Sequence, residues 1–181
     1  MANKIRRINL IGSPGNGKST VAASLFGRLK IKRYNIELVT EFVKSWAAES
    51  KEITYWDQLH IFGQQHQLEY HWLKNNTDLI ITDCPLFIPI VYTKDFVCND
   101  GLADNLFNIY QEYEKAYPSL NILLYRDINY DYDSRNRYHT EEESMDIQEN
   151  IIRELNDSNI SFKIFVSSQI DEMEKYINAN L

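Results

Sequence analysis

A glycine-rich segment near the N-terminus constrains the fold more than any other part of the chain. Residues 12–19 read Gly-Ser-Pro-Gly-Asn-Gly-Lys-Ser, which fits the pattern G-x-x-x-x-G-K-[ST]. The segment follows an apolar run, 5–11, and precedes a stretch, 19–30, with apolar residues at helical spacing. Such a turn can wrap backbone N–H groups around an anion, and the helix adds the positive end of its dipole. The segment therefore predicts a phosphate-binding loop.

The positions of this loop have expected roles in holding ATP and Mg²⁺. Lys18 would reach the β- and γ-phosphates, and the Ser19 hydroxyl would coordinate Mg²⁺. Thr20 would contact the α-phosphate. The residues expected to bind ATP are Gly12, Pro14, Gly15, Asn16, Gly17, Lys18, Ser19 and Thr20.

Short apolar runs alternate with longer amphipathic stretches along the rest of the chain. This alternation predicts an α/β fold with a parallel sheet, and 181 residues with 44% hydrophobic content suit a single domain, 1–181. Strands are expected at 5–11, 36–40, 78–82, 120–125 and 162–166, and helices at 19–30, 41–48, 56–73, 102–113, 141–155 and 169–178, with a further helix after Cys84-Pro85.

The net charge of -7 limits the classes of partner. An acidic chain has no overall basic field to hold nucleic acid or an anionic membrane, although a local basic groove for DNA stays open. The N-terminus reads as neither a signal peptide nor a membrane span, so we expect a cytoplasmic protein. Cys84 and Cys98 lack metal-ligand spacing and are expected to be reduced thiols, without zinc. A homodimer is compatible with the sequence.

Two acidic residues follow expected strands. Asp83 ends the apolar run Leu-Ile-Ile-Thr-Asp, and Glu41 follows the second strand. The carboxyl ends of parallel strands face the ligand crevice, so both carboxylates should enter one site. Asp83 is the candidate Mg²⁺ residue together with Ser19, and either acid would serve as the base for the acceptor hydroxyl. The structural alternatives are a cap of the following helix for Asp83 and a first-turn helical position for Glu41.

The helix expected at 56–73 is the candidate for lining the site that binds the phosphoryl acceptor. Gln65 falls on its apolar stripe, where an amide needs a partner; a nucleobase or nicotinamide edge is one candidate, and the protein backbone is the other. Gln64 or Gln67 would take this role if the helix phase differs. The stripe is Leu59, Phe62, Leu68 and Trp72, and the aromatic residues that would stack on a base, or simply fill the core, are Trp56, Phe62 and Tyr70.

The polar segment of about 127–140 is expected to be a lid. Arg137 and Arg135 would close over the nucleotide and stabilise the charge of phosphoryl transfer, with Arg126 behind them as a substrate contact. Thr140 and Glu143 form a capping-box pattern that places the next helix start after the arginines. The alternative is a solvated loop whose arginines pair with nearby aspartates.

Taken together, these segments resemble the AAA-type P-loop kinases of phages and bacteria, which are related to the ribosylnicotinamide kinase domain of bacterial NAD-regulator proteins and to deoxynucleoside kinases. The resemblance rests on 12–20, Glu41, the helix segment 57–65, 82–86, and Arg137 ahead of Thr140. It implies a three-layer α/β sandwich with five parallel strands in the order 2-3-1-4-5 and an ATP-dependent kinase of a nucleoside, nucleotide or modified base. Cys84-Pro85 stands where deoxynucleoside kinases carry an arginine, and Asn136 stands where a lid glycine is common.

Two other function classes compete with a small-molecule kinase. One is a phage-type kinase acting on a hydroxymethylated DNA base or a polynucleotide 5′-hydroxyl, which the acidity disfavours. The other is a nucleotide-dependent regulatory ATPase; the guanine motif N-K-x-D of GTPase switches does not occur in the chain.

Overall fold

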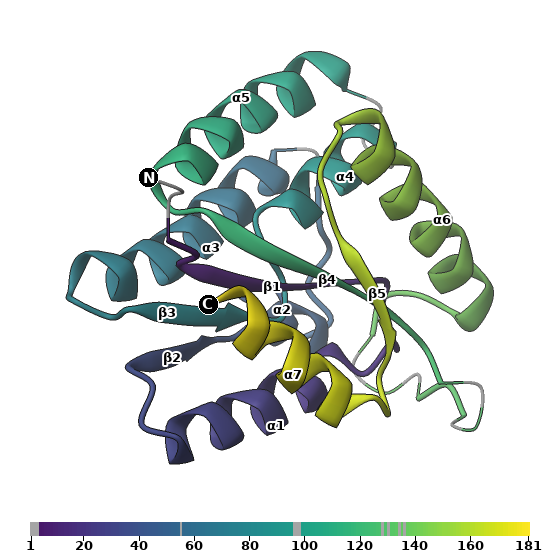
Figure 1. The fold of residues 1–181 in the computed structure, drawn as a ribbon. Coiled ribbons are helices and arrows are strands. Elements are labelled where there is room, and N and C mark those ends of the chain that lie inside the picture. Colours follow the sequence, from purple (N-terminus) through teal and green to yellow (C-terminus); the bar gives the residue numbers. More distant parts are fainter. Residues whose placement is uncertain are drawn as a thin grey trace.

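The computed structural model describes residues 4–54, 56–95, 99–127, 129, 131–133, 135 and 137–181 (Figure 1). Cys98 and Asn136 therefore lie outside the described residues. The elements are β1 Arg7–Ile11, α1 Lys18–Ile31, β2 Ile36–Val39, α2 Lys44–Ala48, α3 Asp57–Lys74, β3 Leu79–Thr82, α4 Phe87–Asp95, α5 Asp100–Ala116, β4 Ser119–Tyr125, α6 Glu141–Asp157, β5 Lys163–Val166 and α7 Ile170–Asn180.

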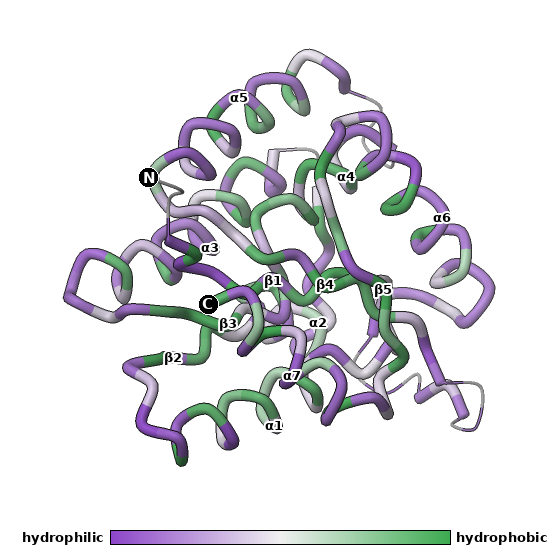
Figure 2. Tube along the Cα trace, in the orientation of Figure 1, coloured by the Kyte–Doolittle hydropathy of each residue, from purple (hydrophilic) through white to green (hydrophobic). Residues whose placement is uncertain are grey.

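The strands form a parallel sheet in the order β2-β3-β1-β4-β5, as the resemblance implied. Helices α1 and α7 cover one face, and α3, α4, α5 and α6 lie on the other (Figure 1). All five residues of β1 are buried. Ile8, Leu10 and Ile11 pack in the core, and the two polar residues have partners inside the fold, with Arg7 paired to Glu69 and Asn9 donating to Asn121. Figure 2 shows the hydrophobic strands in the middle layer, with hydrophilic residues on the outer turns of α5 and α6.

Helix α3 confirms the expected stripe only in part, because Phe62 and Gln65 are buried and the other stripe residues are exposed. Leu59, Leu68 and Trp72 are 48%, 40% and 37% exposed. Three of the buried positions are polar. Gln65 and Glu69 are paired with residues of other elements, and Gln58 lines the cavity described below. The buried residues of α3 are Gln58, Ile61, Phe62, Gln65, Glu69 and Leu73.

The second helix starts later than the sequence indicates. We expected 41–48, whereas α2 begins at Lys44, so Glu41 precedes the helix instead of occupying its first turn. The other predicted elements are present with ends shifted by a few residues, and the helix after Cys84-Pro85 is α4. Of the described residues, no helix combines the length and the apolar character that crossing a membrane requires.

Arg7 anchors the amino end of β1 through buried charges. Its guanidinium is fully buried and lies 3.3 Å from the Glu69 carboxylate, which is also fully buried, and it pairs with Glu114 as well. Burial raises the pKa of Glu69 to about 7, even though Arg7 favours the carboxylate. Between pH 4.5 and about 7 the folded chain thus holds a proton that the unfolded chain releases. The contribution of Glu69 to stability consequently falls as the pH rises through this window.

Arg7→Leu is expected to lower the free energy of unfolding by about 3–5 kcal/mol at neutral pH, because it leaves Glu69 buried without its cation. The loss should be smaller at pH 5, where Glu69 is protonated. Urea unfolding at the two pH values measures both effects. Arg28→Leu is the matched control. Arg28 and its partner Asp171 are exposed, and its second partner Glu174 keeps Lys32 as a cation, so the change should alter stability little. Equal losses of unfolding free energy in Arg7→Leu and Arg28→Leu would contradict a special role for the buried Arg7 ion pair.

Candidate functional site

The glycine-rich loop joins β1 to α1, where the sequence predicted it. Gly12, Gly15 and Gly17 have φ values of 152°, 91° and 77°, in the region that favours glycine. A Cβ on Gly12 would also lie 2.7 Å from the Leu124 carbonyl oxygen. Gly17 caps α1 in a left-handed conformation, which directs the first turn of the helix toward the loop. Both the backbone and the helix end are therefore arranged as an anion cradle.

Lys18 lies at the centre of the site. Its Nζ donates to the Ser13 carbonyl oxygen at 2.8 Å, so the ammonium is held against the loop. Burial lowers the pKa of Lys18, while Glu41, Cys84 and Asp83 act in the opposite direction. The structure thus brings Lys18, Glu41 and Asp83 into one electrostatic group.

Ser19 and Asp83 form a donor set that fits a divalent cation. The Ser19 hydroxyl donates to Asp83 Oδ2 at 2.6 Å. Asp83 is buried, and its Oδ1 has no hydrogen-bond partner among the described residues. A hard cation such as Mg²⁺ takes oxygen ligands of these two kinds and would satisfy that buried oxygen. Helix α4 begins at Phe87, four residues after Asp83, so the Asp83 carboxylate serves the loop and not the helix cap.

Glu41 lines the same cavity beside the Cys84 thiol. Burial raises the pKa of Glu41, Lys18 opposes this shift, and the Cys84 thiol donates a hydrogen bond to the carboxylate. Burial also raises the pKa of Cys84, so the thiol stays protonated. As expected, Cys84 is buried and not disulfide-bonded. Glu41 is therefore a desolvated carboxylate with increased basicity, placed beside the ammonium of Lys18.

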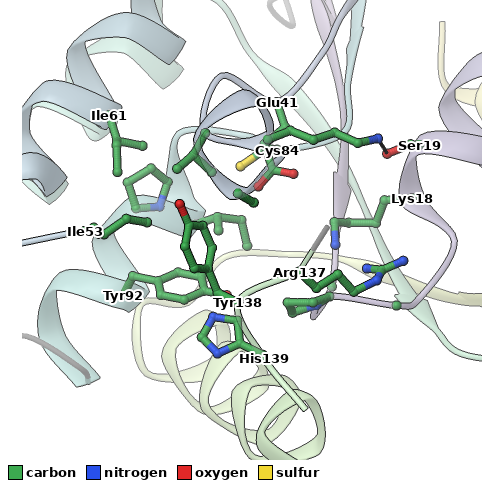
Figure 3. Close-up of a pocket in the computed structure, with 18 of the residues that line it drawn as sticks. Lys18, Ser19, Glu41, Ile53, Ile61, Cys84, Tyr92, Arg137, Tyr138 and His139 are labelled. Atoms are coloured by element: carbon green, nitrogen blue, oxygen red, sulfur yellow. Dashed lines mark hydrogen bonds between the residues drawn. The ribbon is translucent and has the colours of Figure 1, made fainter. Parts of the chain in front are cut away.

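A cavity of about 360 Å³ extends from the glycine-rich loop past Glu41 to an apolar end (Figure 3). Lys44, three residues after Glu41, also lines it, and its Nζ lies 3.4 Å from Ser19 Oγ. The sequence did not single out Lys44, although its spacing from Glu41 was a usable signal. The apolar end is lined by Val43, Ala47, Ile53, Ile61, Ile88, Pro89 and Tyr92.

Gln65 of α3 is hydrogen-bonded within the protein and does not line the cavity. The Gln65 amide oxygen accepts from the Phe42 N–H at 3.0 Å, and its Nε2 donates to Thr82 Oγ1 at 3.3 Å. Gln65 is thus the core amide of the structural alternative, and Gln64 and Gln67 are exposed. Gln58, two turns earlier and 6% exposed, lines the cavity instead. Trp56 is exposed, whereas Phe62 and Tyr70 pack in the core, so none of these rings lines the cavity.

Two of the three candidate lid arginines reach the cavity. Arg137 lines it near Lys18, with its guanidinium 5.5 Å from the centre of the Tyr132 ring (Figure 3). Arg135 also lines it but is held by Asp133 through two 2.9 Å hydrogen bonds. Arg126 pairs with Glu141, and its Nη1 is buried without a partner among the described residues. Arg126 lies at the base of the lid and outside the cavity lining.

The C-terminal part of the lid closes one side of the cavity. Tyr138 and His139 line it, and the Tyr138 hydroxyl donates to the Lys51 carbonyl oxygen at 2.6 Å. The Tyr92 and His139 rings lie 5.8 Å apart. Thr140 and Glu143 form the predicted capping box at the start of α6. We had not singled out Tyr138 and His139, although they directly follow Arg137.

The model of the AAA domain family matches residues 7–172, which is most of the chain. The chain belongs to the AAA domain family. No curated protein matches the sequence. Among solved structures, this AAA domain is similar to a deoxyadenosine kinase from M. mycoides with dCMP and dCDP bound, at 18% identity and a TM-score of 0.60, covering 96% of this chain and 99% of that one.

A second similar structure is that of NadR protein in complex with NAD and AMP-PNP. Here the identity is 14% and the TM-score 0.67, with 98% of this AAA domain covered. The chain spans about half of NadR, because the match covers 51% of that protein. The two structures agree with the families that the motifs resemble, and at these identities they establish a shared P-loop kinase-like fold.

Proposed function

We propose that this protein is an ATP- and Mg²⁺-dependent kinase that transfers the γ-phosphoryl group to a hydroxyl or phosphate of a nucleoside-like acceptor. The observation that carries the proposal is the single cavity that joins Lys18 and Ser19 to Glu41 and then to an apolar end. A phosphate donor at one end and a ring-shaped acceptor at the other would meet beside Glu41. Acceptors of the same chemistry include nucleosides, nucleotides and nicotinamide riboside.

Each group has a defined part in this reaction. Glu41, desolvated and with a raised pKa, accepts the proton of the attacking hydroxyl. Lys18 and Arg137 face the transferring group and stabilise its equatorial oxygens. Ser19 and Asp83 would hold Mg²⁺, which neutralises charge on the phosphates when bound. Closure of the lid over the cavity would exclude water and so favour transfer over hydrolysis.

A transfer assay with γ-labelled ATP and Mg²⁺ tests the proposal. Nucleosides, nucleoside monophosphates, nicotinamide riboside and hydroxymethyluracil-containing DNA are offered side by side. Label on a small acceptor supports the proposal. Label on DNA alone would show that the acceptor is a nucleic acid and not a small molecule. Release of free phosphate alone would indicate a regulatory ATPase.

Gln58 is the proposed reader of the acceptor ring. Unlike Gln65, whose amide is used within the core, Gln58 presents a donor and an acceptor at the cavity wall. Gln58→Leu is expected to raise KM for the acceptor about tenfold, because the polar edge of the acceptor loses its partner. KM for ATP should not change. The control is Gln64→Leu, at an exposed position of the same helix; an equal rise in that variant would remove the role from Gln58.

A further inference from the structure

The back of the phosphate-binding loop is held by two side chains of α6. The Gln148 side-chain oxygen accepts from the Ser13 N–H at 2.8 Å and from Asn16 Nδ2 at 2.9 Å. One turn earlier, the Ser144 hydroxyl lies 3.0 Å from Ser13 Oγ and bonds to the Pro14 carbonyl oxygen. Gln148 and Ser144 are 130 or more positions away from their loop partners in the sequence. They are four residues apart in α6 and therefore lie on one face of the helix.

The network is buried and its polar groups are paired. Gln148 and Ser144 are 8% and 5% exposed, and Asn16 is 5% exposed. Asn16 Nδ2 also donates to the Leu124 carbonyl oxygen at 2.8 Å, which ties the loop to the end of β4. Water has little access to these groups, so losing Gln148 would leave the buried Ser13 N–H without a partner and Asn16 Nδ2 with the Leu124 carbonyl oxygen alone.

The lid enters the same helix directly. Its last residues, Tyr138 and His139, precede Thr140, which caps α6. The lid thus ends at the N-cap of α6, and Ser144 and Gln148 lie in the first turns of that helix. One rigid helix therefore contacts the loop and continues into the lid.

We propose that Gln148, supported by Ser144, is a positioning residue that fixes the curvature of the phosphate-binding loop and couples it to the lid. The Gln148 side-chain oxygen accepts the Ser13 N–H on the side of the loop that faces α6. The N–H groups of Gly15, Gly17 and Lys18 would then bind the anion. The Asn16 side chain faces Leu124 and Gln148 and so shapes the loop, while the expected contact of Asn16 with ATP stays a prediction for its backbone N–H. This inference rests on the proposed ATP binding, but its structural part does not depend on activity.

Gln148→Leu tests it with two measurements on the full chain. Hydrogen exchange of the loop amides in the nucleotide-free protein should accelerate, and the Kd for ATP with Mg²⁺ should rise about tenfold, as expected when buried donors lose their acceptor. Gln67→Leu, at an exposed position of α3, is the matched control and should change neither quantity. Ser144→Ala removes a smaller part of the network and serves if Gln148→Leu does not fold.

The outcomes separate this inference from the proposed function. Unchanged exchange overturns the positioning role, and so does faster exchange with an unchanged Kd. If the wild-type protein does not bind ATP, the proposed function fails, and the exchange measurement still decides whether Gln148 shapes the loop.

Discussion

Lys18→Ala is expected to lower the phosphoryl-transfer rate about a thousandfold, the scale reported for removing one preorganised charge or donor from a transition state. The Lys18 ammonium is held 2.8 Å from the Ser13 carbonyl oxygen, at the mouth of the loop where the γ-phosphoryl group would lie. No other side chain of the loop carries a positive charge. Single-turnover transfer at saturating ATP measures the effect on the chemical step.

The fold should tolerate this change, because alanine is a good helix former at the start of α1. Lys30→Ala is the control within the same helix. Lys30 bonds to the Ile36 carbonyl oxygen and to Glu37, away from the cavity, and its loss should leave transfer intact. Full activity in Lys18→Ala would refute the phosphate-site assignment.

Glu41→Gln is expected to lower kcat by about a hundredfold or more, the range of general-base catalysis, with little effect on ATP binding. Glutamine keeps the size of the side chain but cannot take the proton of the acceptor hydroxyl. In the wild-type protein, kcat should fall as the pH drops through the raised pKa of Glu41, because the carboxylate is then protonated. The variant should lack this acidic limb. A pH profile of kcat measures both effects.

Glu37→Gln, on β2 and engaged with Lys30, is the matched control and should behave as the wild type. Unchanged turnover in Glu41→Gln would assign the role of general base to Asp83 instead of Glu41. That outcome is disfavoured by geometry, since the Asp83 carboxylate already accepts the Ser19 hydroxyl at 2.6 Å.

The parts of the site that depend on local sequence were predictable, and the parts that depend on tertiary contacts were not. The residues from Gly12 to Ser19 predict the loop correctly, because the strand, the turn and the helix that form it follow one another in the sequence. On α3, Phe62 and Gln65 are buried as expected, but Leu59, Leu68 and Trp72 are exposed. The buried face includes Glu69 instead, whose partner Arg7 comes from another element and cannot be read from the local pattern. The apolar end of the cavity draws on α2, α3, α4 and the segment before α3, so no single stretch of sequence reveals it.

The bond between the Tyr138 hydroxyl and the Lys51 carbonyl has a consequence for the timing of turnover. It joins the lid to the segment between α2 and α3 across one side of the cavity, and it is exposed to solvent. A single hydrogen bond of this kind contributes about 1 kcal/mol, a factor of roughly five in a population. Thermal fluctuations therefore break it frequently. Under the proposed function, this weak contact would let an acceptor and its product pass this side of the cavity in either direction.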